Sequence, residues 1–387
     1  MLQPSVIQSL AALTGPVLTV YLDTDQAKQI NRGPKPGYLV RLESQAKLIA
    51  QSIFPDEREL FRKQLRRTEA YLEKQSPRYR GVVTFAGTDS WKVVALQVKV
   101  EDEIQWGAPA RAQLVWLLQE HKKYGVVVGG RKRVRFFVYW LGGIRELEDK
   151  VFRMEPSKKK EMGPVARLGV RVARGTNRDV FEHHVAAEYA HYDHQIAQRI
   201  ARWFVADQLS SVFLVGSTDM VHAIRKEIAP TLAERAVLIE EDLVWVSPTE
   251  LLDRIEPAVL SYKRKCEMDT VEAILGDTRN GELGIDETLV QLQQGQIRGV
   301  VVEKGLKGDA QQCVICSWVD RMSDPACPAC GGKRKHVALA DVLPELVRRY
   351  DASLEVVSGE GAARLHENGG VGGWLRGSEK KEYPASA

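Results

Sequence analysis

The chain has 387 residues, of which 44% are hydrophobic and 27% are charged, and its formal net charge is +4 at pH 7. At roughly 100–200 residues per domain, this length predicts two or three domains. The apolar fraction is large enough to bury several cores. A net charge of +4 is too small to indicate nucleic-acid binding by itself. Only a local cluster of basic residues could indicate it.

No stretch of the chain approaches about 18 consecutive apolar residues, so the sequence predicts no transmembrane helix and no membrane partner. The first 20 residues lack a basic segment and lead directly into a strand-like run, which favours folded protein over a signal peptide. Four of the five cysteines lie between Cys313 and Cys330, whereas a disulfide framework would spread them out. We therefore expect a reducing, cytoplasmic location.

The first predicted domain spans residues 1–109 and mixes strands with helices. Apolar residues recur at helical spacing in its two long helical segments. A basic loop rich in glycine and proline separates the first strand from the first helix. The expected strands are residues 17–22, 81–86 and 91–98, the helices are residues 38–53 and 56–74, and the loop is residues 31–37.

The middle predicted domain spans residues 110–255. After a helix at residues 110–121, glycine-containing links join three strand-like runs, which predicts antiparallel hairpins. A long helix, a strand, a helix and a strand follow. Three antiparallel strands followed by α, β, α, β is the order of a ribonuclease-H-like fold. The expected strands are residues 124–128, 133–140, 143–151, 211–215 and 237–239, and the later helices are residues 179–209 and 219–228.

The third predicted domain spans residues 256–377 and ends in a polar, flexible tail at residues 378–387. Its helices alternate with short apolar strands, which indicates an α/β sandwich. The cysteine-rich segment is predicted to form a zinc ribbon at residues 311–336, inserted into this sandwich. The sequence as a whole therefore predicts an α/β protein of three domains.

The four clustered cysteines form two Cys-x-x-Cys pairs, Cys313/Cys316 and Cys327/Cys330. Each pair places two thiolates on one side of a tight turn, and two such turns complete a tetrahedral sulfur site for zinc. Four thiolates leave no open coordination position, so the expected Zn²⁺ is structural and not catalytic. The fifth cysteine, Cys266, has no partner at a comparable spacing.

Residues 156–178 form the most basic segment of the chain, with seven basic residues and one acidic residue, a net charge of +6. A cationic loop before a helix suits contact with RNA phosphates, and the absence of interleaved aromatic residues argues against base stacking. The turn between two strands adds three more basic residues. The predicted RNA-binding residues are Lys158, Lys159, Lys160, Arg167, Arg171, Arg174, Arg178, Arg131, Lys132 and Arg133.

Two catalytic or metal-binding alternatives are disfavoured by the sequence. His184, Glu188 and His191 share one helical face, but that face lies away from most of the apolar stripe and reads as a solvated polar surface. A two-metal nuclease needs carboxylates on central strands, and the strand at residues 124–128 has none.

The order of these segments resembles the archaeal/eukaryotic class-1 release factor family, which includes Pelota, and in particular its bacterial branch. Residues 124–214 resemble the family's ribonuclease-H-like second domain. Residues 287–292, the run at residues 353–358 and the glycine-rich residues 369–376 resemble the family's third domain. Family members enter the ribosomal A site in a tRNA-like pose, so the resemblance implies the ribosome or tRNA as partner, with a translational GTPase as a further one.

The sequence lacks the Gly-Gly-Gln tripeptide with which true release factors hydrolyse peptidyl-tRNA, and it lacks a codon-reading Asn-Ile-Lys-Ser motif. Pelota also lacks the tripeptide, so the departure is compatible with ribosome rescue. The leading hypothesis is a cytoplasmic factor, associated with ribosomes or tRNA, that acts mainly by binding RNA and not DNA. The alternatives are a peptidyl-tRNA hydrolase with a non-standard loop, with Asn177 or Gln195 placing water, and a zinc-ribbon scaffold for proteins.

Overall fold

The computed structural model describes residues 13, 15–74, 79–130, 132–151, 176–277 and 279–377, with side chains in the helix beginning at Thr176 described from residue 187 onward. The chain divides into two compact units. Unit 1 holds the described parts of Met1–His121, Leu141–Gly143 and Lys263–Tyr383, and unit 2 holds those of Lys122–Trp140 and Ile144–Tyr262. No helix among these residues combines the length and apolar character needed to cross a membrane.

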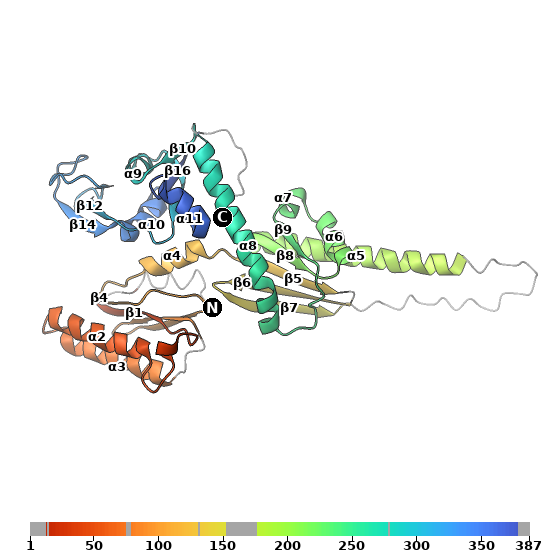
Figure 1. The fold of residues 1–387 in the computed structure, drawn as a ribbon, viewed down its shortest axis with the longest axis horizontal. Helices are drawn as coiled ribbons and strands as arrows, with labels where there is room; N and C mark the ends of the chain where they lie inside the picture. The colour runs from red at the N-terminus through yellow and green to blue at the C-terminus, as the bar shows by residue number, and fades with distance from the viewer. Residues whose placement is uncertain are drawn as a thin grey trace, which may run out of the picture. The chain divides into compact units, whose positions relative to one another are not determined.

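The N-terminal part of unit 1 is an antiparallel sheet in the order β3-β2-β1-β4, with two helices packed on it (Figure 1). The helices form because apolar residues such as Leu42 and Phe61 repeat at helical spacing and point into the core shared with β1. The strands are β1 (Val17–Asp23), β2 (Gly81–Ala86), β3 (Trp91–Leu96) and β4 (Glu103–Gly107), and the helices are α2 (Gly37–Ser52) and α3 (Arg58–Lys74). A short 3₁₀ turn, η1 (Gln29–Asn31), precedes α2.

Unit 2 contains a five-stranded sheet in the order β7-β6-β5-β8-β9. Strand β5 pairs antiparallel with β6 and parallel with β8, and β8 pairs parallel with β9. This arrangement confirms the predicted ribonuclease-H-like order. The strands are β5 (Tyr124–Gly130), β6 (Arg133–Trp140), β7 (Gly143–Val151), β8 (Ser211–Val215) and β9 (Ala236–Ile239), and the helices are α5 (Thr176–Ala206), α6 (Thr218–Glu227) and α7 (Pro230–Ala233). Helix α8 (Pro248–Gly276) begins in unit 2 and belongs to unit 1 from Lys263 onward.

Both faces of this sheet are covered, which explains the uninterrupted apolar run in β5. Val127 faces a core that includes Ile200 of α5, whereas Val126 and Val128 face a core that includes Leu251 of α8. Successive residues of a strand point to opposite faces, so a central strand with helices on both sides must be apolar throughout.

The C-terminal part of unit 1 is a mixed sheet in the order β10-β16-β11-β15. Strand β11 runs parallel to β15 and antiparallel to β16. Helices pack on this sheet and form the predicted α/β sandwich. The strands are β10 (Gly281–Leu283), β11 (Ile297–Glu303), β15 (Ser353–Val357) and β16 (Val371–Leu375), and the helices are α9 (Ile285–Gln293), α10 (Leu339–Arg349) and α11 (Gly359–His366).

Helix α4 (Ala112–Glu120), predicted as the start of the middle domain, lies in unit 1. It packs against α10 and β15, and the Trp116 indole donates a hydrogen bond of 2.8 Å to the carbonyl of Ala340. The predicted boundary at residues 255 and 256 falls inside the continuous helix α8. Local sequence could not predict that α4 packs here, because the hydrogen-bond acceptor of Trp116 is 224 positions away in the chain. The division into three domains stays a prediction.

The cysteine-rich segment forms a small separate sheet between β11 and α10, in the order β13-β12-β14. Its strands are β12 (Asp309–Cys313), β13 (Val319–Asp320) and β14 (Arg334–Ala338). Ala310 and Val319 are buried in the same core as Leu343 of α10. The ribbon is therefore packed onto the sandwich by its own apolar residues.

Candidate metal centre

The two Cys-x-x-Cys turns have the same backbone design. In the first turn, the N–H of Ser317 donates to the carbonyl of Cys313 at 3.1 Å, and in the second, Gly331 donates to Cys327 at 2.8 Å. Ser317 and Gly331 both have left-handed backbones, with φ of 63° and 71°. Each turn therefore closes by the same hydrogen bond and the same reversal of the chain immediately after its second cysteine.

The four sulfur atoms are close enough to hold one metal ion. All four lie within 4.8 Å of one another. The Sγ atoms of Cys313 and Cys330 are 3.5 Å apart, and those of Cys316 and Cys327 are 3.6 Å apart. A disulfide needs a separation of about 2.0 Å, whereas sulfurs bound tetrahedrally to zinc at roughly 2.3 Å lie about 3.8 Å apart. The arrangement therefore matches a tetrahedral metal site formed by four free cysteines.

Without a metal, the four thiols do not all ionise at neutral pH. Backbone N–H groups of Cys316 and Ile315 lower the pKa of Cys313 to about 6. A backbone N–H at Trp318 lowers the pKa of Cys316, but burial and the neighbouring thiols outweigh it and raise that pKa to about 12. Four adjacent sulfurs cannot all ionise without a compensating positive charge, and a bound metal supplies that charge.

Two polar contacts hold the ribbon in position. The side-chain amide of Gln293 in α9 bonds both the carbonyl and the N–H of Val319, each at 2.7 Å. Arg334 in β14 forms an ion pair with Asp320 in β13, and both side chains are more than nine-tenths buried. Spacing rules find the four ligands but not these supporting residues, because Gln293 is distant in sequence and the buried pair has no local signature.

The matched turns give a prediction about backbone strain. Ser317→Gly is expected to stabilise the ribbon by about 0.5–1 kcal/mol, because a left-handed backbone disfavours a residue with a side chain. Gly331→Ala is expected to destabilise the ribbon by about 1–2 kcal/mol for the same reason, since no atom lies near enough for a steric clash. Thermal unfolding of the metal-loaded variants measures both effects, and a shift in the same direction for both would contradict this account.

The predicted RNA-binding residues lie mostly outside the described part of the chain. This holds for Arg131 and for the basic segment up to Arg174, while Arg178 lies in α5 where only the backbone is described. Lys132 is exposed in the turn between β5 and β6. Arg133 makes a bidentate pair with Asp149, at 2.8 and 2.6 Å, and lies over the ring of Trp245.

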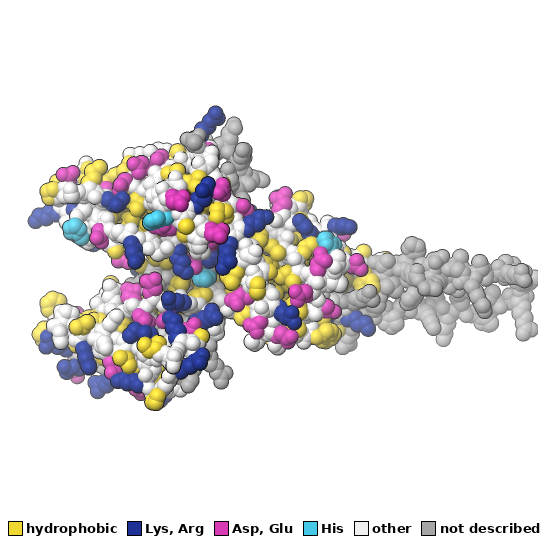
Figure 2. Space-filling model, viewed as in Figure 1, with side chains coloured by type: hydrophobic (Ala, Val, Ile, Leu, Met, Phe, Trp, Pro, Cys, Tyr) yellow, Lys and Arg dark blue, Asp and Glu magenta, His cyan; other side chains and the backbone are white. Residues whose placement is uncertain are grey.

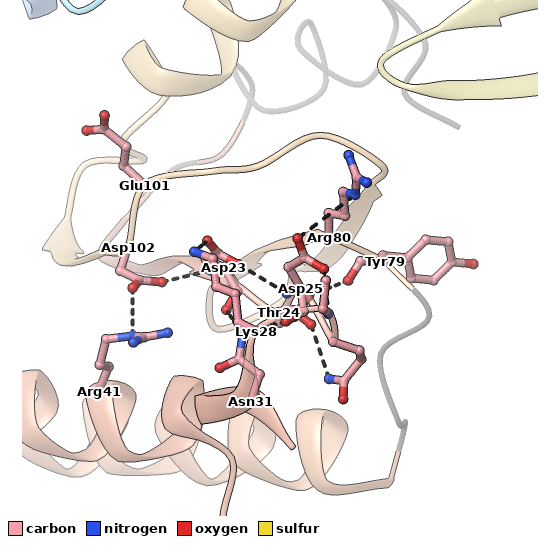
Figure 3. A network of polar contacts seen from close by, with 12 residues as sticks. Asp23, Thr24, Asp25, Lys28, Asn31, Arg41, Tyr79, Arg80, Glu101 and Asp102 are labelled. Carbon is pink, nitrogen blue, oxygen red and sulfur yellow. Dashed lines mark hydrogen bonds and ion pairs between the residues drawn. The ribbon is translucent and has the colours of Figure 1, made fainter. Parts of the chain in front are cut away.

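The basic loop after β1 is ordered by internal polar contacts (Figure 3). The buried Asp23 pairs with Lys28, and the Asn31 amide donates to the carbonyls of Asp23 and Asp25, each at 3.1 Å. Arg32 bonds the carbonyl of Gln26. Lys35, at the other end of the loop, pairs with Glu43 at 2.7 Å. The positive charges of this loop are therefore largely used within the protein.

A cavity of about 420 Å³ lies between α5 and α6 and is lined by six polar residues and two alanines. Burial, with a smaller contribution from Glu227, raises the pKa of Asp193 to about 6. Beside the cavity, His194 Nδ1 lies 2.9 Å from a carboxylate oxygen of Glu227. Among the described residues, only the four cysteines form a cluster suited to a metal ion, so the histidines of α5 described here do not form one.

The raised pKa of Asp193 predicts a pH-dependent stability. The pKa of Asp193 is about 6 in the folded chain and 3.8 ordinarily, so the folded state favours the protonated carboxyl. The contribution of this carboxyl to folding stability is therefore complete below about pH 4 and is lost as the pH rises through 6. Asp193→Asn should therefore raise stability at pH 7 by about 1 kcal/mol, a value reduced for solvent screening, and should have little effect at pH 4. Urea unfolding at both pH values measures this. The exposed Asp219 at the start of α6 is the control, because Asp219→Asn should give no gain at pH 7.

Residues 109–258 match the family described as bacterial archaeo-eukaryotic release factor family 10. This region covers the whole five-stranded sheet of unit 2. No curated protein matches the chain.

Several solved structures resemble the chain at low identity. An archaeal translation termination factor, aRF1, is 11% identical, with 96% of each chain covered and a TM-score of 0.24. Pelota from Archaeoglobus fulgidus is 14% identical, with 76% of this chain and 79% of that chain covered and a TM-score of 0.29. Dom34 from S. cerevisiae is 10% identical, with 79% and 81% covered and a TM-score of 0.40.

Proposed function

We propose that this chain, which is related to the archaeo-eukaryotic release factors through its ribonuclease-H-like unit, is a translation factor that binds the ribosome or tRNA and acts mainly by RNA binding. The observation that carries the proposal is the family match over residues 109–258. The order of the five strands in that region, and the directions of β5, β6, β8 and β9, agree with the fold that this relationship implies. We place the factor in the cytoplasm, where its target is found.

The basic segment at residues 156–178 is the proposed RNA contact. Its net charge of +6 follows from the sequence. Its last three residues are the first three residues of the long helix α5. Lysine and arginine bound to phosphates release counterions, so this contact is expected to weaken steeply with salt. Lys132, in the turn between β5 and β6, is exposed and is proposed to have the same role.

We propose that the four-cysteine site holds zinc with a structural role. The sulfur separations of 3.5 and 3.6 Å support tetrahedral coordination of one ion. Four thiolate ligands are a set that suits zinc. In this role the ion ties together the two turns of the ribbon, which rests on the C-terminal sandwich through Ala310 and Val319. All four ligand positions are filled by protein, so the site offers none to a substrate.

One relative suggests a further partner. The structure of Dom34 from S. cerevisiae is described as that of a translation termination-like factor that interacts with Hbs1. By analogy, we propose a translational GTPase as a second partner of this chain. Pull-down of the tagged full chain with each candidate GTPase, in the presence and absence of GTP, tests this point, and failure with every candidate would contradict it.

Co-sedimentation with purified ribosomes across a salt series tests the main proposal. Wild type is compared with a variant in which Lys158, Lys159, Lys160, Arg171 and Arg174 are all changed to alanine. We expect wild type to pellet with ribosomes at low salt and the variant to pellet about tenfold less or weaker still, because five potential phosphate contacts are lost. If wild type stays in the supernatant even at low salt, the proposal fails and a protein-binding scaffold becomes the better explanation.

A further inference from the structure

Helix α3 carries several exposed cations on its outer side, five of them between Arg58 and Arg67. Its inner side, which includes Phe61 and Leu72, is buried in the core of the N-terminal sheet. The remaining side of the helix faces solvent, and six of its exposed side chains are basic. These six residues, which we call the α3 basic face, are Arg58, Arg62, Lys63, Arg66, Arg67 and Lys74.

The cations of the α3 basic face are not neutralised by carboxylates, although Arg66 Nε donates a hydrogen bond of 3.4 Å to the carbonyl of Arg62. Among the described residues, none of the six takes part in an ion pair, whereas Lys35 on the neighbouring loop pairs with Glu43. Glu59 and Glu73 are also exposed on α3, and Glu69 has a pKa raised by burial and by nearby Glu43 and Glu73. Figure 2 shows lysine and arginine side chains gathered over the lobe that contains α2 and α3. Unpaired cations therefore outnumber the exposed acids on this helix.

One arginine of the face is held in place before any partner binds. The guanidinium of Arg67 lies 4.7 Å from the centre of the Trp91 ring, and Trp91 in turn makes an edge-to-face contact with Tyr71 at 5.7 Å. Stacking fixes the plane of a guanidinium while its N–H groups stay available at the edge. An ordered arginine loses less side-chain entropy on binding an anion than a freely rotating one does.

We infer that the α3 basic face binds the phosphate backbone of RNA. From Arg58 to Lys74 the helix rises about 24 Å, at about 1.5 Å per residue, so the row can follow several phosphates along one strand. Arg58, Arg62 and Arg66 recur every four residues and line one side of this row. The contact reads backbone charge and not base sequence, and a polyanion is the partner that complements a long row of unpaired cations.

This inference rests on the proposed function, since it adds a second RNA contact to that of a ribosome-binding factor. The two contacts are separate in the sequence, because the proposed basic segment lies at residues 156–178 and α3 ends at Lys74. Each can therefore be removed without changing the other. One RNA contact on α3 and another within residues 156–178 would let the chain engage two places on a large RNA.

The test measures binding of the full chain to a short A-form RNA duplex and to purified ribosomes over a series of KCl concentrations. One variant changes Arg58, Arg62 and Arg66 to glutamine, and a second changes Lys63, Arg67 and Lys74 to glutamine. A control variant changes three exposed arginines of other helices, Arg202, Arg225 and Arg264, to glutamine. All three variants lose the same charge, so a general effect of net charge appears equally in each.

We expect each α3 variant to bind the duplex about tenfold more weakly than the control variant at low salt, with a smaller dependence of affinity on salt. If the α3 variants and the control bind alike while wild type binds ribosomes, the inference is overturned and the proposed function stands. If wild type binds neither ribosomes nor duplex at low salt, both are overturned. Thermal unfolding of the Arg58, Arg62 and Arg66 variant should match wild type, because these side chains are exposed, and this shows that its weaker binding does not arise from misfolding. The second variant also loses the stacking of Arg67 on Trp91, so a small decrease in its temperature of unfolding is expected.

Discussion

Changing Cys327 to serine is expected to abolish binding of the proposed structural metal and to unfold the ribbon. Cys327 is buried, and its sulfur lies 3.6 Å from that of Cys316 within the four-cysteine cluster. A structural zinc site contributes about 10–16 kcal/mol of binding free energy, which is coupled to folding, and serine does not replace a thiolate ligand. Metal analysis of the purified chain should fall from about one zinc per chain to near zero, with a lower temperature of unfolding.

The fifth cysteine provides the matched control for this experiment. Cys266 lies in α8 and is not one of the four clustered residues, so Cys266→Ser should retain the metal. The unfolding of the ribbon should also weaken the C-terminal sandwich, because Val319 packs in the same core as Leu343. Full metal content in the Cys327→Ser variant would contradict the four-thiolate site. Iron in place of zinc in the wild-type chain would contradict only the identity of the ion.

Changing Arg135 to methionine is expected to destabilise unit 2 by about 2 kcal/mol, which is below the cost of breaking a fully buried ion pair because Glu146 is 30% exposed. The Arg135 side chain is 5% exposed and makes two bonds to Glu146, at 2.7 and 2.9 Å. It also donates to the carbonyls of Val244 and Val246, and Arg133 is a second, longer donor to Val244. Loss of Arg135 therefore leaves the Glu146 carboxylate and the Val246 carbonyl without their arginine donor. Urea unfolding of the full chain, followed by tryptophan fluorescence, measures the change.

Arg133, two residues earlier on the same strand, is the control for Arg135. It makes an equivalent bidentate pair with Asp149, but its own side chain is 20% exposed and that of Asp149 is 40% exposed, compared with 5% and 30% for Arg135 and Glu146. Water can therefore replace more of the lost bonds at Arg133. Arg133→Gln should therefore change stability far less than Arg135→Met. An equal loss of stability in the two variants would show that the cost comes from changing any arginine of β6 and not from burial of the Arg135 side chain. The same Arg133→Gln variant reports on RNA binding, since Arg133 is among the predicted RNA contacts.

Several features of this protein follow from the sequence because they depend on short-range patterns. The spacing of Cys313, Cys316, Cys327 and Cys330 predicts four sulfurs around one point, and the structure brings these sulfurs within 4.8 Å of one another. The order of strands and helices in residues 124–239 predicts the ribonuclease-H-like sheet, since hairpins and crossovers leave few ways to connect such elements. The basic segment at residues 156–178 is likewise visible from composition alone, but its role as an RNA contact stays a prediction.

Other features were decided only by tertiary structure. The sequence gives Arg32 and Arg58 the same charge, but the fold bonds Arg32 to a carbonyl of its own loop and leaves Arg58 facing solvent. Helix α4 follows the first domain in sequence, yet Trp116 packs it against residues more than two hundred positions later. Charge availability and helix packing depend on which distant groups meet. No local sequence pattern predicts these long-range contacts, because they depend on burial and hydrogen bonding over the whole folded chain.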